Sequence, residues 1–241
     1  LELVRKLKIP LVICTSKTRA EVEVYRRKLD TEHPFIAENG GGIYSPRNYF
    51  KNISMYSPES AHGYEVIILG TPYHKLRHTL VELREEGFGV RGFGDMTAGE
   101  ISSLTGLSNE EASLAKQRDF DEAFIFKGNP VQLRKAVHEH GLNLTEGRLY
   151  HLLGGNDKGK AMDIIRELYL LEDPDTVFIA LGDSPTDAPM LQRADYPVLI
   201  RKDDGTYDDR VTAPGIRKTK SPGPKGWNEA VMEILSRLGL T

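Results

Sequence analysis

The chain of 241 residues contains one cysteine, and it lacks long apolar runs and any marked excess of one charge. Cys14 cannot form an intramolecular disulfide, and its place in the apolar run 10–15 indicates a small buried hydrophobic residue. This cysteine usage fits a reducing compartment, so we expect a cytoplasmic protein. No apolar run approaches the roughly 18 residues that a membrane-spanning helix needs. A net charge of −3 lacks the basic patch typical of nucleic-acid or anionic-membrane binding. A small-molecule partner is therefore expected.

The order of the expected elements indicates an α/β fold interrupted by an inserted domain. A length of 241 residues with 39% hydrophobic residues allows one large or two modest domains. The first and last parts of the chain alternate helices and strands, which favours a parallel sheet. The middle part reads instead as a small α+β domain. We predict a core domain over 1–66 and 155–241 and an inserted domain over 67–154. The elements expected around the insertion are helices 17–29 and 158–172, strands 10–15, 35–38 and 176–182, and a last helix 227–238.

Two carboxylates follow the strand expected at 176–182. Asp183 and Asp187 are separated by the turn-forming residues Ser-Pro-Thr, so they lie in a loop that leads into the next helix. Carboxylates at the carboxyl end of a buried parallel strand lie where open α/β sheets bind ligands. Two acids there suit Mg²⁺, which prefers oxygen ligands. The alternative is that one of them only caps the next helix.

Three further segments place polar groups at strand ends or helix starts. Thr15-Ser-Lys17-Thr18 combines hydroxyls, a lysine and free helix N–H groups, which suits either an anion site or a plain helix cap. Glu38-Asn39-Gly-Gly-Gly42 allows close approach of the backbone to a ligand, positive φ angles or a tight hairpin turn. Lys158, at a helix start, can neutralise a phosphate or a carboxylate. No G-x-G-x-x-G fingerprint is present, which argues against a dinucleotide cofactor.

In this order, these segments resemble the motifs of the haloacid dehalogenase (HAD) superfamily of phosphatases. Thr15 matches the second motif of that superfamily, Lys158 the third, and Gly182-Asp183-Ser-Pro-Thr-Asp187 the fourth. The resemblance implies a Rossmann-like core with a parallel sheet and an inserted α+β cap of the Cof type (C2B). It also implies Mg²⁺ held by Asp183 and Asp187, and Thr15, Lys158, Asp183 and Asp187 as the catalytic set.

Five longer segments are similar to the mannosyl-3-phosphoglycerate phosphatase family within that superfamily. They are distributed over nearly the whole chain, cap segments included: 15–21, 34–40, 118–122, 147–151 and 223–227. One departure is Thr186, where the family commonly has Asn. Since a shorter polar side chain can still form a hydrogen bond, we expect this change to tune activity and not to abolish it.

The first motif of the superfamily has no counterpart in the sequence. No apolar strand ends in Asp-x-Asp-x-Thr, and Asp119-Phe-Asp121 precedes its strand. In the resembling fold the strand with this motif lies between those that end here at Thr15 and at Gly182. We therefore expect the nucleophilic aspartate upstream of residue 1. The alternative is an inactive, ligand-binding pseudoenzyme.

The resemblance implies hydrolysis of a phosphomonoester through an aspartyl-phosphate, with mannosyl-3-phosphoglycerate as the favoured substrate and a compatible solute, mannosylglycerate, as the product. The sugar hydroxyls and the glycerate carboxylate need cationic and amide partners. We expect Lys17 and Asn39 to supply them from the core, and Arg118, Arg148 and His151 from the cap. The alternative substrate is another sugar phosphate, such as glucosyl-3-phosphoglycerate. The sequence leaves this choice and the oligomeric state open.

Overall fold

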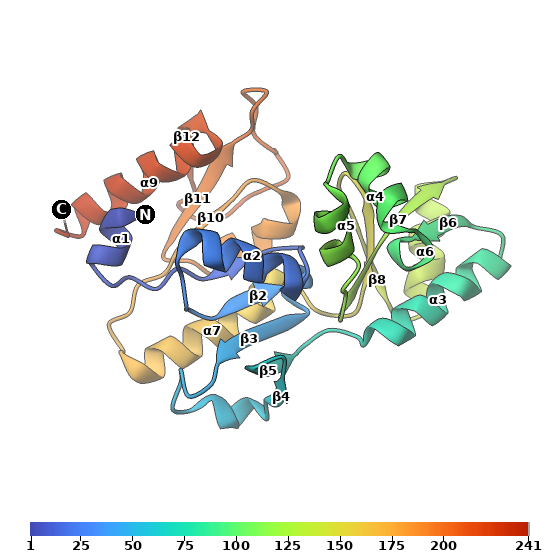
Figure 1. Ribbon diagram of the computed structural model, residues 1–241. Helices are drawn as coiled ribbons and strands as arrows, with labels where there is room; N and C mark the ends of the chain where they lie inside the picture. Colours follow the sequence, from blue (N-terminus) through green and yellow to red (C-terminus); the bar gives the residue numbers. More distant parts are fainter. Residues whose placement is uncertain (241) are drawn as a thin grey trace. The chain divides into compact units, whose positions relative to one another are not determined.

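The structure of the protein is a computed structural model that describes residues 1–240 (Figure 1). The chain divides into two compact units that are each continuous in space but not in sequence. Unit 1 consists of residues 1–11, 50–55 and 157–241, and unit 2 consists of residues 12–49 and 56–156. Each unit is described by itself below.

Unit 1 is a parallel sheet covered by helices. Its strands are β10 (Ile179–Gly182), β11 (Tyr196–Arg201) and β12 (Arg217–Pro222), and they pair in that order. Parallel strands need a crossover, and α8 (Ala188–Leu191) lies in the connection from β10 to β11. The long helices are α7 (Lys158–Glu172) and α9 (Gly223–Arg237).

The core of unit 1 forms on the apolar stripe of α9. Ala230 and Ile234 pack with Val198 of β11, and Val231 and Leu235 pack with Val4 of α1 (Glu2–Lys6). Because these α9 positions recur at helical spacing, one face of the helix is buried. The expected core role of the helix at 227–238 is confirmed, although the helix begins earlier, at Gly223.

The first sheet of unit 2 has the order β1-β2-β3-β5-β4. β1 (Ile13–Cys14) and β2 (Phe35–Ala37) are parallel and are connected through α2 (Arg19–Leu29). The remaining pairs are antiparallel and involve β3 (Gly42–Pro46), β4 (Glu59–Ala61) and β5 (Tyr64–Ile68). The start of α2 at Arg19 follows from a capping box, in which Thr18 and Glu21 satisfy each other's backbone N–H groups.

The second sheet of unit 2 is antiparallel throughout. Its order is β6-β7-β9-β8, formed by Gly89–Gly92, Asp121–Lys127, Tyr150–Leu153 and Asn143–Glu146. Helices α3 (Tyr73–Glu85) and α6 (Pro130–Glu139) share a core with it, in which Leu76, Leu80 and Leu133 are fully buried. A second core holds Ile101 of α4 (Ala98–Thr105) and Ala112 of α5 (Asn109–Ala115).

The predicted fold class agrees with these two kinds of sheet. The parallel strands belong to segments predicted for the core, and the antiparallel sheet with α3 to α6 lies entirely within the 67–154 segment predicted as an insertion. Packing nevertheless groups that segment with residues 12–49 and 56–66 in one compact unit. The domain boundaries at 66/67 and 154/155 therefore stay a prediction.

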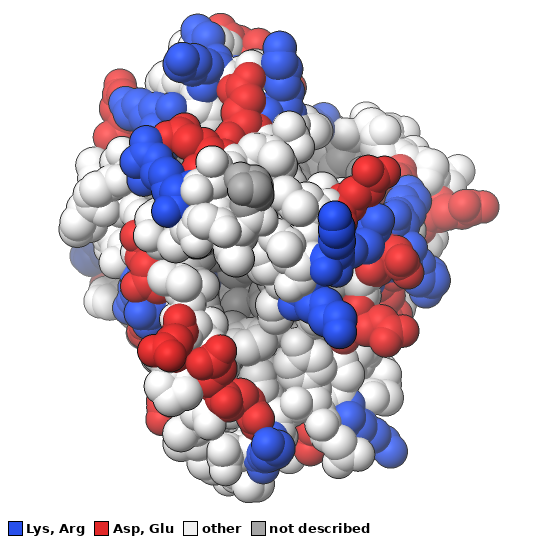
Figure 2. Space-filling view, turned by 90° about the vertical axis from the view of Figure 1, so that its left-hand side faces the viewer, with Lys and Arg blue, Asp and Glu red and all other residues white. Residues whose placement is uncertain are grey.

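The surface mixes charges of both signs. Figure 2 shows Lys and Arg interspersed with Asp and Glu on the face in view, as the net charge of −3 leads one to expect. Within residues 1–240, no helix is long and apolar enough to cross a membrane.

Candidate active site

The loop after β10 closes on the carboxylate of Asp187. One of its oxygens, Oδ2, accepts the backbone N–H groups of Asp183 and Ser184, both at 3.1 Å, and the Ser184 hydroxyl at 2.9 Å. Gly182 is required here, because a Cβ at this position would lie 2.5 Å from the Cβ of Asp187. The short 3₁₀ turn Pro185–Asp187 then leads into α8. The prediction that this segment is a strand, a loop and a helix is confirmed.

Lys158 provides a cation for the other oxygen of Asp187. Its Nζ donates to Oδ1 over 2.5 Å, and both side chains are buried. Asp157 caps α7 and thereby fixes Lys158 as the first helical residue. Burial opposes ionisation of Asp187, but the charge of Lys158 together with the hydrogen bonds from Lys158, Ser184 and Asp183 N outweighs it and holds the pKa of this carboxyl below its usual range. The two buried charges thus form a pair at the start of α7.

Asp183 differs from Asp187 because its side chain is exposed. Both oxygens of Asp187 already accept hydrogen bonds, which leaves Asp183 as the carboxylate of the motif that is accessible to a ligand. Mg²⁺ is commonly bound through one or two carboxylates and keeps several waters, so an exposed Asp183 suits it. Within residues 1–240, no group of three or more His, Cys, Asp or Glu side chains is arranged to hold a metal ion. Asp183 alone therefore does not complete a metal site among these residues.

In unit 2, two turns that carry predicted site residues are joined by backbone hydrogen bonds. Asn39 N donates to the carbonyl of Thr15, and Glu38 N donates to the carbonyl of Lys17, both over 3.0 Å. The Thr15 hydroxyl accepts the N–H of Lys17 at 3.2 Å. The Lys17 ammonium pairs with Glu21 at 2.9 Å and stays partly exposed. Thr15, Lys17 and Asn39, proposed from the sequence alone, are thus neighbours in the fold.

The turn that follows β2 is strained. Glu38 and Asn39 both adopt positive φ angles, of 49° and 55°. For residues other than glycine this conformation costs on the order of 1 kcal/mol or more, and such residues cluster at functional sites. The sequence left three roles open for Gly40 to Gly42: close approach to a ligand, positive φ angles or a hairpin turn. The structure shows two of them, since Gly40 has positive φ and β2 and β3 form an antiparallel hairpin. Gly41 lets Phe120 approach, since a Cβ there would lie 2.4 Å from the Phe120 Cβ.

The Glu38 carboxylate connects this turn to a segment about 80 residues further along the chain. It accepts the N–H of Asp119 at 3.0 Å and that of Phe120 at 2.7 Å. The side chain is fully buried, and this burial raises the pKa of Glu38 to about 8 against the lowering effect of Arg118 and the two N–H groups. The contact fixes the position of Arg118 and Asp121 relative to the turn.

Asp121 brings three of the predicted substrate residues together. Its Oδ1 accepts from Arg118 at 3.0 Å and from His151 Nδ1 at 2.7 Å, and its Oδ2 accepts from Asn39 at 2.8 Å. In the sequence, Asp121 enters only through Asp119-Phe-Asp121, which does not fit the first motif because it precedes its strand, and Asp121 is not assigned to the site. The available signal was its proximity to Arg118, three residues away, within a segment that resembles the family.

Arg148 lies apart from this cluster. It is exposed in the turn between β8 and β9, where Gly147 N donates to the carbonyl of Leu149. An exposed guanidinium is accessible to an anionic ligand, whereas Arg118 and Asn39 are buried.

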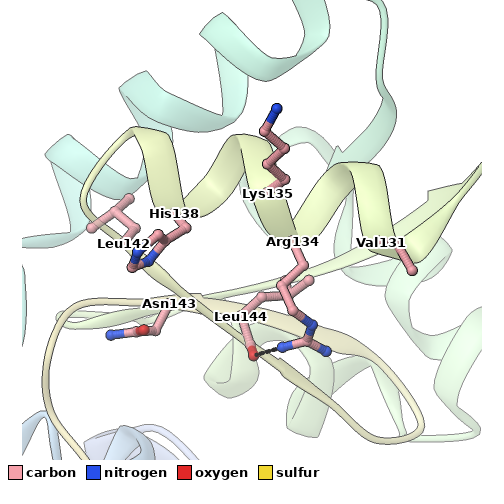
Figure 3. Close-up of a pocket in the computed structure, with 7 residues that line it drawn as sticks. All are labelled: Val131, Arg134, Lys135, His138, Leu142, Asn143 and Leu144. Atoms are coloured by element: carbon pink, nitrogen blue, oxygen red, sulfur yellow. Dashed lines mark hydrogen bonds between the residues drawn. The ribbon is translucent and has the colours of Figure 1, made fainter.

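A groove along α6 is one concave feature of unit 2. It has a volume of about 410 Å³, and Figure 3 shows Arg134 in it with a hydrogen bond of 3.0 Å to the carbonyl of Leu144. None of the residues proposed from the sequence lines this groove, so it is not part of the candidate site. Its lining residues are Val131, Arg134, Lys135, His138, Leu142, Asn143 and Leu144.

Comparisons with known proteins agree on the fold. No family model matches the chain. A solved phosphatase of the HAD superfamily from Bacteroides thetaiotaomicron superimposes with a TM-score of 0.62 at 18% identity, covering 100% of this chain and 86% of the other. The parallel sheet with Asp183 and the Lys158–Asp187 pair at its carboxyl edge, together with this similarity, defines a HAD-type α/β fold.

Two curated relatives identify the family of phosphatases to which the chain is similar. A glucosyl-3-phosphoglycerate/mannosyl-3-phosphoglycerate phosphatase of Methanococcoides burtonii is 43% identical over 98% of this chain and 89% of its own length. Its counterpart in Persephonella marina is 40% identical over 99% and 89%. The chain therefore belongs to the family of glucosyl-3-phosphoglycerate and mannosyl-3-phosphoglycerate phosphatases, and it is a phosphoric monoester hydrolase.

Proposed function

We propose that the protein hydrolyses mannosyl-3-phosphoglycerate to mannosylglycerate and phosphate, and that it also accepts glucosyl-3-phosphoglycerate. The buried Lys158–Asp187 pair beside the exposed Asp183 is the observation that carries this proposal. It puts a fixed cation and an accessible carboxylate at one strand end, which is what the transfer of an anionic phosphoryl group requires. The names of the two relatives supply the substrates.

Each residue near β10 has a separate task in the proposal. Lys158 neutralises charge on the phosphoryl oxygens, and Asp187 holds the ammonium in place, so no reorganisation is needed during the reaction. Asp183 is a ligand for Mg²⁺, which when bound neutralises phosphate charge. The Thr15 hydroxyl of unit 2 donates a hydrogen bond to a phosphate oxygen. Phosphoryl transfer depends mainly on such positioning and charge neutralisation.

The proposed reaction proceeds in two steps. An aspartate carboxylate attacks phosphorus and displaces the glycoside, and water then hydrolyses the aspartyl-phosphate. Within residues 1–240 no strand ends in Asp-x-Asp-x-Thr, so this carboxylate is assigned to no residue of the chain. Rapid quenching with substrate labelled in the phosphate, followed by peptide mapping of the protein from its natural source, tests the covalent step.

The residues proposed to recognise the substrate, directly or through a neighbouring side chain, fall into two groups. Lys17 and Asn39 lie at the turns after β1 and β2, and Arg118, Arg148 and His151 belong to the 67–154 segment. Arg148 suits the glycerate carboxylate because it is exposed and carries five N–H donors. The proposed partner is thus a phosphorylated glycoside, with neither nucleic acid nor membrane involved.

Phosphate release from a substrate panel tests the function. Protein expressed from the complete coding sequence should release phosphate from both glycosyl-3-phosphoglycerates faster than from simple hexose phosphates, with mannosylglycerate visible by NMR. Faster release from another sugar phosphate would instead indicate a phosphatase of different specificity. Binding of mannosyl-3-phosphoglycerate without any release would indicate a binding protein.

A further inference from the structure

The Asp121 carboxylate joins side chains from three segments of the chain. Its two oxygens accept three hydrogen bonds, from Asn39 after β2, Arg118 before β7 and His151 in β9. Asp121 itself is fully buried, and its pairing partners Arg118 and Asn39 are also buried. The Arg118 guanidinium in addition lies over the Phe93 ring, with 5.6 Å between the guanidinium carbon and the ring centroid. The cluster is thus held in one arrangement by contacts on several sides.

These contacts fix where the protons are. Burial opposes ionisation of Asp121, but the charges of His151 and Arg118 together with the hydrogen bonds from His151 and Asn39 outweigh it and keep the pKa of this carboxyl below its usual range. An ionised carboxylate only accepts hydrogen bonds, so Nδ1 of His151 must carry a hydrogen and donate it. Nε2 is then the nitrogen left for a ligand. The His151 side chain is 17% exposed, against 4% for Arg118, so His151 is the partner of Asp121 that reaches the surface.

Three buried polar atoms around the same cluster have no hydrogen-bond partner within residues 1–240. They are Asn39 Oδ1, Arg118 Nε and Asn156 Oδ1. Asn156 belongs to this neighbourhood because its amide nitrogen donates to the carbonyls of Glu38 and Asn39, at 3.4 and 3.3 Å. Buried polar groups are nearly always satisfied by protein, water or ligand. The unused acceptor of Asn39 lets this amide rotate if the hydrogen-bonding character of Asp121 changes.

We propose that Asp121 is a positioning residue of the substrate site, which holds His151 so that its Nε2 contacts a hydroxyl or the carboxylate of the bound glycoside. This inference rests on the proposed phosphatase function and assigns a further residue to its site. Asn39 and Arg118 act in it through Asp121, since their side chains are buried and hydrogen-bonded to that carboxylate.

Asp121→Asn is the decisive variant because a rotation of the neighbouring Asn39 amide can accommodate the new side chain. The new amide nitrogen would face the Asn39 amide nitrogen, but Asn39 Oδ1 is buried without a partner, so rotation of that amide restores the hydrogen bond. The substitution removes the charge that holds His151. We expect KM for mannosyl-3-phosphoglycerate to rise about 10-fold, as for the loss of one charge-assisted hydrogen bond, while kcat changes less than about 2-fold.

Asp95→Asn is the matched control. Asp95 also pairs with arginines of unit 2, Arg77 and Arg84, but it contacts none of the proposed substrate residues. We expect its loss to lower Tm without changing KM. A purely structural role for Asp121 predicts the same result for Asp121→Asn, namely a lower Tm with unchanged KM, and that result would overturn the inference.

His151→Asn gives a second, independent test. It keeps a donor near the position of Nδ1 but removes Nε2, so KM should rise as much as in Asp121→Asn. In the double variant the two effects should not add, because both act through the same contact. Additive effects, or an unchanged KM in His151→Asn, would contradict the inference even if Asp121→Asn failed to fold.

A spectroscopic measurement separates positioning from stability. Long-range ¹H–¹⁵N correlation spectra should show His151 with its hydrogen on Nδ1 in the wild type, and a shift of its Nε2 signal on addition of mannosylglycerate. In Asp121→Asn the amide oxygen can still accept from Nδ1 but carries no charge, so His151 should be held less firmly and the shift should become smaller. If wild-type protein releases no phosphate from either glycosyl-3-phosphoglycerate, the proposed function fails. If it is active and both variants keep the wild-type KM, the positioning role alone fails.

Discussion

Units 1 and 2 each bury an aspartate against a cation, but they form the pair differently. In unit 1, Asp187 binds one cation, Lys158, and the rest of its hydrogen bonds come from the loop of its own motif. In unit 2, Asp121 accepts from three side chains on separate segments. The first arrangement places one fixed charge, and the second organises several donors at once.

This difference corresponds to two parts of the proposed reaction. A phosphoryl group needs concentrated positive charge at one place, which a buried lysine supplies. A glycoside with several hydroxyls and a carboxylate needs donors and acceptors spread over a surface, which a network supplies. We therefore expect changes in unit 1 to act mainly on kcat and changes in unit 2 to act mainly on KM.

The largest expected effect comes from Lys158→Met. Loss of the ammonium removes charge neutralisation in the transition state and leaves Asp187 buried without its cation, so kcat should fall about 100-fold or more. Phosphate release under saturating substrate measures it. Lys160→Met, an exposed lysine on the same helix turn, should keep kcat within about 2-fold of wild type. A Lys158 variant with normal kcat and raised KM would contradict the expectation that changes in unit 1 act mainly on kcat.

Glu38→Gln should change how stability depends on pH in unit 2. Since the folded-state pKa of about 8 lies above the ordinary value of 4.5, the folded protein keeps this proton where the unfolded chain has lost it. The stability from this group is present below pH 4.5 and is lost as pH rises towards 8, on the order of a few kcal/mol in total. Thermal unfolding between pH 5 and 8 should show a smaller fall in Tm for the variant. An equal fall in both proteins would refute the assignment.

Asp183→Asn sharpens the comparison within unit 1. The exposed Asp183 is proposed to bind Mg²⁺ while the buried Asp187 holds Lys158, so the variant should need at least about 10-fold more Mg²⁺ for half-maximal activity. Wild-type activity should be lost with EDTA and recovered with excess Mg²⁺. If Asp183→Asn has the Mg²⁺ dependence of wild type, the carboxylate has another role.

Arg148→Ala tests the exposed side of unit 2. If Arg148 binds the glycerate carboxylate, its loss should raise KM about 10-fold with kcat nearly unchanged. Arg134→Ala is a suitable control, since Arg134 lies in the α6 groove and pairs with Glu146 and the carbonyl of Leu144. Equal effects of the two substitutions would show that Arg148 contributes through general surface charge.

The same difference explains how much the sequence could predict. The proposed site residues of unit 1 lie in short motifs at a strand end and a helix start. Local pattern could therefore single out Lys158, Asp183 and Asp187 as candidates, and the resemblance to the superfamily gave them a joint role. The Asp121 cluster of unit 2 depends on contacts between residues that are far apart in the sequence. Asn39 and Asp121 are 82 positions apart, and Asp121 and His151 are 30 positions apart, so no local pattern encodes these contacts. Polar strands were missed for a related reason. β12, Arg-Lys-Thr-Lys-Ser-Pro, has no apolar alternation and is a strand because it pairs with β11.

Thr186→Asn should have the smallest effect of the five substitutions. The Thr186 hydroxyl lies 2.9 Å from that of Ser184, whose own hydroxyl donates to Asp187. Because the Ser184 hydrogen goes to Asp187, Thr186 is the donor of this hydrogen bond. Asparagine, which is common at this position in the family, can donate it through its amide nitrogen, and a net contribution of about 1 kcal/mol limits the change in kcat to about 5-fold. Thr186→Val, which keeps the shape but lacks the hydroxyl, should lower kcat further than Thr186→Asn. The reverse order would show that Thr186 acts on Asp187 by packing and not through Ser184, and that the motif of unit 1 tolerates loss of this contact.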